Sequence, residues 1–241
     1  MRKSVVIIPT YNEKENILRM LDKVMSLDYP FDVLVVDDDS PDGTAELVKT
    51  KQKEYDHIHL LENGEKNGLG TAYIAGFKWC LERDYDFIFE MDCDFSHNPD
   101  DLIRMNNQLV SGKTDMVIGS RYVGNVVNVV NWPMSRVLMS YFASAYVRFF
   151  TRMKVADATA GFIGYTADLL KLIDLDKIKF RGYAFQIEMK YTTYKLGYKI
   201  TEIPIIFTDR TAGESKMSGG IFREALLGVI SLRFKNIKPR V

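Results

Sequence analysis

The sequence predicts an α/β protein built on a mainly parallel, Rossmann-like sheet with helices on both faces. Two observations lead to this prediction. Short apolar runs without alternation, typical of strands that are buried on both faces, recur through the first half of the chain. Segments with helical spacing of apolar residues lie between these runs, and such alternation is typical of βαβ units. With 241 residues, 46% of them hydrophobic, the chain can bury one large core.

The first predicted elements are two strands and the helix between them. Residues 4–8 form an apolar run that ends at Pro9, which predicts a first strand rather than a signal peptide. Asn12 is a suitable N-cap for a helix over about 13–27. The next strand, 33–36, leads into the strong turn signal Ser40-Pro41-Asp42-Gly43.

The later elements are predicted on the same grounds. Further strands are expected at 58–61, 86–91 and 115–119 and after 157–162. Further helices are expected at about 44–55, 70–83 and 136–150, from Pro99, from the 181–189 segment, and within 216–241.

Polar residues follow three of the predicted strands, at the carboxyl ends where α/β sheets bind ligands. They are Thr10-Tyr11-Asn12-Glu13, Asp37-Asp38-Asp39 and Asp92-Cys93-Asp94. In an extended chain, the carboxylates of Asp92 and Asp94 point to the same side, with Cys93 facing the core. Mg²⁺ prefers oxygen ligands and often keeps the phosphates of a substrate. The pattern predicts a nucleotide diphosphate held through a metal, and a solvated acidic strand end is the alternative.

Other classes of protein are disfavoured. The first turn has no glycine, and Gly68-x-Gly70 has Tyr73 in place of a third glycine, so the fingerprint of a dinucleotide-binding dehydrogenase is absent. A Walker loop is absent as well. Lys+Arg and Asp+Glu both total 32, and no recognition motif indicates nucleic acid. The two cysteines, Cys80 and Cys93, provide no disulfide framework and suit a reducing cytosol. No apolar run approaches the ~20 residues that span a bilayer.

A long stretch without acidic residues lies in the middle of the chain. It covers 116–156 and contains five cations: Arg121, Arg136, Arg148, Arg152 and Lys154. Residues 136–150 are apolar on most sides, which fits either a buried helix or a helix at a membrane interface with Trp132 at the headgroup level. The segment 216–241 has six cations, one acid and an amphipathic pattern that also suits a membrane surface.

A further loop, 209–216, is rich in residues of phosphate-binding type. Arg210, Ser215 and Lys216 can clamp a pyrophosphate as the loop closes, and an ordinary surface loop is the alternative.

Together these segments resemble the polyprenol-phosphate (dolichol-phosphate) mannosyltransferases, within the family-two inverting glycosyltransferases of GT-A fold. The resemblance covers nearly the whole chain. It rests on the three polar strand ends and on segments 68–73, 119–122, 131–133, 185–189 and 209–216.

The resemblance implies roles for individual residues. Asp92 and Asp94 serve the donor and its Mg²⁺ or Mn²⁺, with Asp94 as the direct ligand, and Arg121 and Arg136 bind the phosphate of the lipid acceptor. Five residues line the nucleoside pocket and three hold the donor diphosphate: Pro9, Tyr11, Glu13, Val36 and Asp38, and then Arg210, Ser215 and Lys216.

The chain departs from the family pattern at two positions. Ser96 stands where some relatives have a glutamine that also reaches the metal, which leaves the third ligand open. Ala160 stands where relatives often have Ser or Gly, so no catalytic role is assigned to residues 157–162.

The implied reaction moves mannose from GDP-mannose to a polyprenyl (dolichyl) phosphate with inversion. The acceptor is already anionic, so no dedicated base is needed. Another donor such as UDP-glucose, and a non-catalytic nucleotide- or lipid-binding module, are the alternatives.

The expected organisation is a catalytic domain over 1–215, including an amphipathic interfacial segment at 132–153, followed by a basic amphipathic helix over 216–241. We expect a cytoplasmic protein that is peripheral on the cytoplasmic face of the membrane, and a separate membrane-protein partner is left open.

Overall fold

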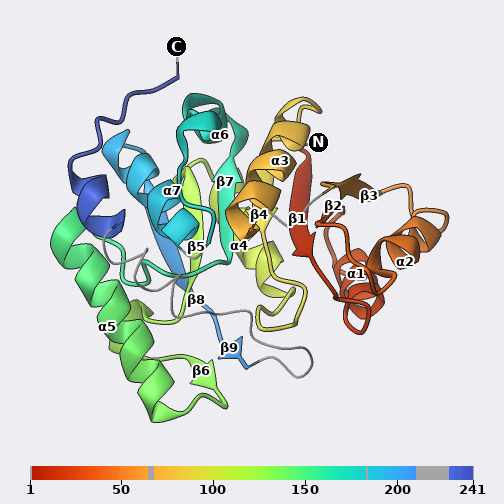
Figure 1. Ribbon diagram of the computed structural model, residues 1–241, viewed down its shortest axis with the longest axis horizontal. Helices are drawn as coiled ribbons and strands as arrows, with labels where there is room; N and C mark the ends of the chain where they lie inside the picture. The colour runs from red at the N-terminus through yellow and green to blue at the C-terminus, as the bar shows by residue number, and fades with distance from the viewer. Residues whose placement is uncertain (1, 65–67, 183, 210–227, 241) are drawn as a thin grey trace.

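The computed structural model describes residues 2–64, 68–182, 184–209 and 228–240 (Figure 1). A seven-stranded sheet of order β3-β2-β1-β4-β7-β5-β8 forms its centre. Strands β1 to β4 are parallel, as are β5 and β8, whereas β7 is antiparallel to both of its neighbours. The strands are β1 (Ser4–Thr10), β2 (Phe31–Asp37), β3 (Ile58–Glu62), β4 (Phe87–Glu90), β5 (Met116–Ser120), β7 (Ile163–Thr166) and β8 (Ile200–Pro204).

Helices cover both faces of the sheet, because strand residues alternate between two hydrophobic clusters. Val6 and Ile8 of β1 face the cluster that contains residues of α1, α2 and α4, while Val5 and Ile7 face the one that contains residues of α3, α5, α6 and α7. The mainly parallel sheet with helices on both faces is therefore confirmed. The helices are α1 (Ile17–Met25), α2 (Thr44–Lys51), α3 (Leu69–Leu81), α4 (Asp101–Val110), α5 (Met134–Thr151), α6 (Ala167–Leu172) and α7 (Ala184–Lys195).

Some predicted boundaries were wrong. The first helix begins at residue 17 rather than 13, because Asn12 is in the left-handed region with a φ of 57° and the backbone forms a turn before the helix starts. The cap position falls on Asn16 instead of Asn12. Near the C-terminus, residues 228–233 are helical and residues 235–240 are not, so the described part of the 216–241 segment is helical over a shorter range than predicted. Residues 216–227 and 241 lie outside the described residues.

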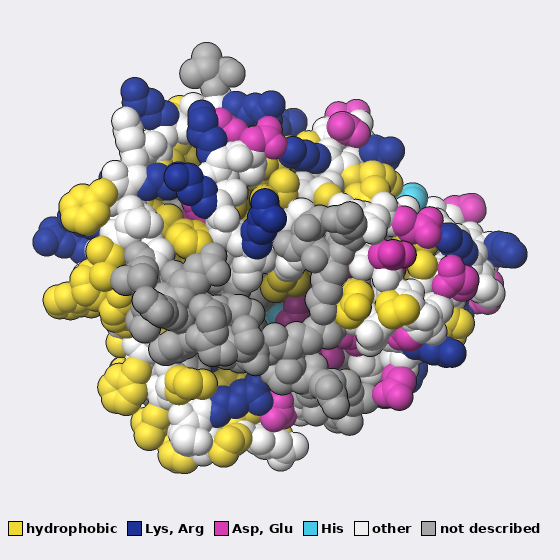
Figure 2. Space-filling view, in the orientation of Figure 1, with side chains coloured by type: hydrophobic (Ala, Val, Ile, Leu, Met, Phe, Trp, Pro, Cys, Tyr) yellow, Lys and Arg dark blue, Asp and Glu magenta, His cyan; other side chains and the backbone are white. Residues whose placement is uncertain are grey.

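Helix α5 lies along one side of the molecule, near the two-stranded parallel ribbon of β6 (Val129–Val130) and β9 (Phe207–Thr208) (Figure 1). Of its 18 residues, only Ser144, Val147 and Thr151 are buried, so the alternative of an ordinary buried helix is wrong. Large apolar side chains gather on its outer side (Figure 2), namely Met134, Leu138, Tyr141, Phe142 and Phe149. No described helix is long and apolar enough to cross a membrane.

Candidate active site

Three neighbouring parallel strands, β2, β1 and β4, end at one edge of the sheet, as the sequence predicted. Thr10 lies opposite Asp37 across two of these strands, and its hydroxyl donates to the Asp37 carboxylate at 2.6 Å. The same carboxylate also accepts from the backbone N–H and the hydroxyl of Ser40, at 2.8 and 2.7 Å. Asp37 therefore links the end of β1 to the loop after β2.

The residues expected around a nucleoside lie in and beside these two loops. Pro9 and Val36 are opposite each other in the β1–β2 register, and Val36 is fully buried in the core. Asp38 is buried and accepts a hydrogen bond from the Asn63 side chain at 3.0 Å. Tyr11 and Glu13 are half-buried on the loop after β1. The expected diphosphate clamp, Arg210, Ser215 and Lys216, lies outside the described residues.

The Asp92–Asp94 segment forms a turn after β4 rather than a continuation of the strand, so the extended geometry that we predicted is wrong. The turn closes through Phe95, which has a φ of 59°, and through a hydrogen bond from the Ser96 N–H to the Asp94 carboxylate at 3.0 Å. Both carboxylates nevertheless border the same pocket. Cys93 lies in the hydrophobic core, as predicted.

His97 packs against this turn and contacts its backbone. The backbone N–H of Asp92 donates to Nδ1 of His97 at 3.3 Å, so this nitrogen accepts and the ring is neutral. Burial lowers the pKa of His97, which favours the same neutral form. The ring stacks on Phe162 with a centroid distance of 4.9 Å, and its edge meets Phe207 at 5.4 Å. The Asp92 turn thus has a rigid aromatic support.

The chemistry of these side chains fits a divalent cation. The Asp92 side chain is 40% exposed, and the hydroxyl of Ser96 is buried at the pocket without a hydrogen-bond partner among the described residues. In the described part of the chain, no three His, Cys, Asp or Glu side chains are arranged to hold a metal ion together. Two carboxylates without a complete protein cage suit Mg²⁺ or Mn²⁺, whose remaining positions go to water and substrate phosphates.

Arg121, directly after β5, forms the opposite wall together with Asp157. The guanidinium makes a bidentate ion pair with the Asp157 carboxylate, with Nε and Nη2 both at 2.7 Å from its oxygens. The Arg121 backbone N–H donates to the same carboxylate at 3.0 Å, and Nη2 also donates to the Thr159 hydroxyl at 2.8 Å. Both charged residues are buried. Burial alone would raise the pKa of the Asp157 carboxyl, but the Arg121 guanidinium holds that pKa below its ordinary value.

Trp132 lies between the two arginines. Its ring is 4.2 Å from the Arg136 guanidinium and 5.5 Å from that of Arg121, distances that permit cation–π attraction. Arg136 also pairs with Asp209 at 2.8 Å. Trp132 was a candidate for the headgroup level of a membrane, and the structure places it at the pocket instead.

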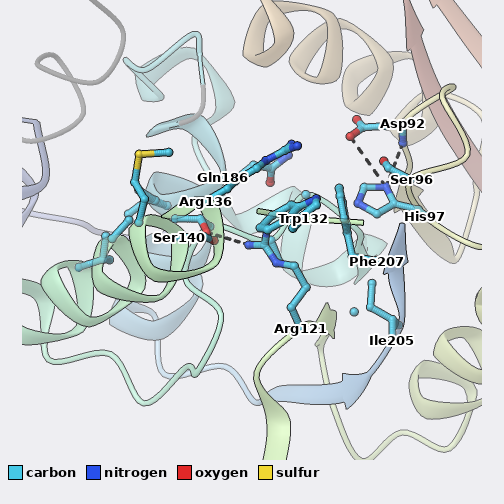
Figure 3. Close-up of a pocket in the computed structure, with 18 of the residues that line it drawn as sticks. Asp92, Ser96, His97, Arg121, Trp132, Arg136, Ser140, Gln186, Ile205 and Phe207 are labelled. Carbon is cyan, nitrogen blue, oxygen red and sulfur yellow. Dashed lines mark hydrogen bonds and ion pairs between the residues drawn. The ribbon is translucent and has the colours of Figure 1, made fainter. Parts of the chain in front are cut away.

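These groups surround one pocket with a volume of about 230 Å³ (Figure 3). Asp92, Ser96 and His97 lie together on one side, and Arg121, Trp132 and Arg136 lie across from them. The inner side of α5 supplies an apolar wall that includes Ala143, Tyr146 and Val147. The four residues predicted to be catalytic, Asp92, Asp94, Arg121 and Arg136, all border this pocket. The residues expected around the nucleoside are not among those that line it.

Sequence reasoning missed Asp157, because it assigned no catalytic role to residues 157–162. Asp157 is 36 residues from its arginine partner, and its loop precedes the strand that inserts between β4 and β5. The available signal was the position of Asp157 as the first acid after a stretch of five cations.

The Asp157→Asn variant tests the ion pair. An asparagine keeps the shape but leaves the buried guanidinium without its counter-charge, so we expect the free energy of unfolding to fall by about 3–5 kcal/mol at pH 7. Because the folded pKa of Asp157 is lowered, its stabilisation is present above the ordinary pKa of an aspartate and is lost as the pH falls through the folded value.

Denaturant unfolding between about pH 7 and pH 2 measures both effects, and Asp168→Asn, at a highly exposed aspartate, is the matched control. Equal stability of Asp157→Asn and the wild type at pH 7 would contradict a stabilising role for the pair.

Comparison with known proteins agrees with this architecture. Residues 5–173 match the family model "Glycosyl transferase family 2". An undecaprenyl-phosphate mannosyltransferase of Micrococcus luteus is 45% identical, and the match covers 98% of both chains. A polyprenol monophosphomannose synthase of Mycolicibacterium smegmatis is 42% identical over 230 residues, which cover 95% of this chain and 86% of that protein.

Solved structures share the fold at low identity. Glucosyl-3-phosphoglycerate synthase from Mycobacterium tuberculosis, in complex with Mn²⁺, UDP and glucosyl-3-phosphoglycerate, matches with a TM-score of 0.71 and 16% identity over 96% of this chain and 80% of its own. The mannosyltransferase PcManGT from Pyrobaculum calidifontis, in complex with GDP-Man and Mn²⁺, matches with a TM-score of 0.56 and 18% identity. This match covers 96% of the present chain and 70% of PcManGT. The extent of the family match and the identity of the full-length relatives show that this chain is a glycosyltransferase and belongs to glycosyl transferase family 2.

Proposed function

We propose that this protein transfers mannose from GDP-mannose to a polyprenyl phosphate, with inversion at the sugar and with the help of a divalent cation. The observation that carries the proposal is a single pocket with two carboxylates on one side and two arginines on the other. The names of the two full-length relatives indicate a polyprenyl phosphate and a mannosyl group, and a bound GDP-mannose is named for PcManGT.

The two walls suit the two anionic substrates. Asp92 and Asp94 would hold the cation, Mg²⁺ or Mn²⁺, which neutralises charge that develops on the departing diphosphate. Arg121 and Arg136 would bind the acceptor phosphate, because guanidinium groups match phosphate geometry and keep their charge at any physiological pH. Asp157, Trp132 and Asp209 limit the rotation of these two arginines before substrate arrives.

The reaction requires one displacement. An oxygen of the acceptor phosphate attacks the anomeric carbon as the bond from that carbon to the donor phosphate oxygen breaks, and the electron pair leaves with the nucleoside diphosphate. The acceptor is an anion at pH 7, so the site needs cations that orient it more than it needs a general base. The donor side has two further groups of residues in this proposal. The nucleoside site consists of Pro9, Tyr11, Glu13, Val36 and Asp38. The donor diphosphate is held by Arg210, Ser215 and Lys216.

The apolar outer side of α5 supports peripheral attachment to a membrane surface on the cytoplasmic side, where the polyprenyl chain resides. Phe142 and Phe149 are 63% and 78% exposed, and Arg148, Arg152 and Lys154 lie near the end of the same helix. Apolar side chains flanked by cations bind the interface of anionic bilayers. The inner side of this helix borders the pocket, which would place the acceptor phosphate close to the lipid surface.

Transfer assays with a panel of radiolabelled sugar nucleotides and a short polyprenyl phosphate test the proposed reaction. We expect GDP-mannose to be the best donor, with loss of transfer in EDTA and recovery with Mg²⁺ or Mn²⁺. The Asp94→Ala variant should reduce the rate at least about a hundredfold while it remains folded, because it removes the direct metal ligand.

Asp168→Ala, at an exposed aspartate on α6, is the control and should retain full activity. Preference for a UDP-sugar would replace the proposed donor. Metal-dependent transfer by Asp94→Ala at the wild-type rate would overturn the assignment of the metal site.

Flotation with liposomes tests the membrane surface. We expect binding to vesicles that contain anionic lipid at low salt, and a reduction of about tenfold in Phe142→Ser/Phe149→Ser, because both apolar anchors are removed. Val110→Ser, at an exposed valine that ends α4, is the matched control. The attachment would be refuted if the wild type remained unbound under these conditions.

A further inference from the structure

We propose that Lys190 is a positioning residue that keeps Arg121 directed at the acceptor phosphate, through the backbone of residues 156–160. This inference rests on the proposed function, because it assumes that Arg121 binds a polyprenyl phosphate. Lys190 belongs to none of the segments used for metal, donor or acceptor. It lies on α7, the helix from which Gln186 and Ile187 line the pocket.

The surroundings of Lys190 are unusual for a lysine. Its side chain is fully buried, and its ammonium group donates to the carbonyl oxygens of Ala160 at 2.6 Å, Ala158 at 3.3 Å and Gln186 at 3.4 Å. Burial lowers the pKa of Lys190 to about 8, although the carboxylates of Asp157 and Glu90 act in the opposite direction. A buried amine is costly unless its donors are satisfied, and here two of its acceptors belong to one loop.

That loop is held from two sides. Lys190 binds its carbonyl groups, while the Glu202 carboxylate on β8 accepts from the N–H groups of Ala156 and Asp157, at 2.6 and 2.9 Å. Asp157 sits between these two sets of bonds and presents its carboxylate to Arg121. The position of Arg121 therefore depends on a loop whose backbone is fixed by one buried cation and one acid.

The loop also forms part of the pocket. Thr159, which accepts from Arg121, and Ala160, which accepts from Lys190, both line the cavity. Loss of the Lys190 ammonium would leave the carbonyls of Ala158 and Ala160 without this donor, so the loop would shift toward another partner or toward water. The bidentate Asp157–Arg121 geometry is sensitive to such a shift, because both of its N–H···O bonds must stay aligned.

The test is direct binding of farnesyl phosphate, a short polyprenyl phosphate, measured by calorimetry without donor. We expect Lys190→Met to raise the dissociation constant about tenfold, as expected for loss of one aligned charge-assisted bond. Binding of GDP with Mn²⁺ should stay within about twofold of the wild type, because the hydrogen bonds of Lys190 go to Ala158, Ala160 and Gln186 and not to the Asp92–Asp94 segment. Lys195→Met, at an exposed lysine on the same helix, is the matched control.

A double-mutant cycle separates positioning from general loss of structure. In an Arg121→Lys background, which loses the bidentate fork, Lys190→Met should weaken farnesyl phosphate binding by less than about twofold. In an Arg136→Ala background the full, roughly tenfold loss should remain. A purely structural role would weaken phosphate and GDP binding together and would show no selectivity between the two backgrounds.

The outcomes are distinguishable. Wild-type protein that does not bind farnesyl phosphate would refute the proposed acceptor. Wild-type binding that Lys190→Met leaves unchanged would overturn this inference alone, as would equal effects in both backgrounds. Lys190→Gln keeps N–H donors and is the second variant if Lys190→Met does not fold. Failure of both variants to fold would show that Lys190 serves stability and would overturn the inference too.

Discussion

The buried ion pair between Arg121 and Asp157 holds the arginine side of the pocket to the loop that precedes β7. Arg121 follows the last residue of β5, and Asp157 lies just before β7, the strand that enters the sheet antiparallel between β4 and β5. A buried ion pair stabilises a fold only when its geometry is excellent and the other hydrogen-bonding groups of both side chains are also satisfied. Here the pair is bidentate, and a backbone N–H and Thr159 complete its hydrogen bonds. The insertion of β7 and the shape of the pocket wall are thus linked.

The sheet order explains how opposite charges face each other across the pocket. The carboxylates of Asp92 and Asp94 follow β4, and the arginine follows β5, with β7 between those two strands. The two strand ends are therefore not adjacent, and the Arg121 guanidinium pairs with Asp157 on its own side of the pocket. This separation suits a reaction between two anions, because each needs its own neutralising group and the two must approach without repulsion.

Much of this arrangement was predictable from the sequence, because it depends on local patterns. Apolar runs and turn residues located the strands, and parallel strands necessarily place their carboxyl ends at one edge, which brought the Asp37–Asp39 and Asp92–Asp94 segments together. The resemblance to a known family assigned Arg121 and Arg136 to the acceptor phosphate, whereas the absence of acids around them indicated only a buried helix or a membrane interface. The exposed apolar side of α5 was one of two alternatives, since a helix that is apolar on most sides has the same pattern when it is buried.

The contacts that sequence reasoning could not supply are long-range or depend on local backbone detail. Nothing in the periodicity shows that Asp157 meets an arginine 36 residues away, or that the buried ammonium of Lys190 binds two carbonyls of the same loop. The late start of α1 follows from the left-handed conformation of Asn12, a residue that is equally common as a cap. The turn after β4 likewise depends on the left-handed conformation of Phe95, which the sequence pattern does not reveal.

The central claim is that donor and acceptor bind at opposite walls of one pocket. A crystal structure with Mn²⁺, a nucleoside diphosphate and farnesyl phosphate, with the metal located by anomalous scattering, tests it most directly. We expect the manganese peak at the Asp94 carboxylate and the farnesyl phosphate group within hydrogen-bond distance of Arg121 and Arg136. A phosphate group bound elsewhere, with both arginines contacting only protein, would contradict it.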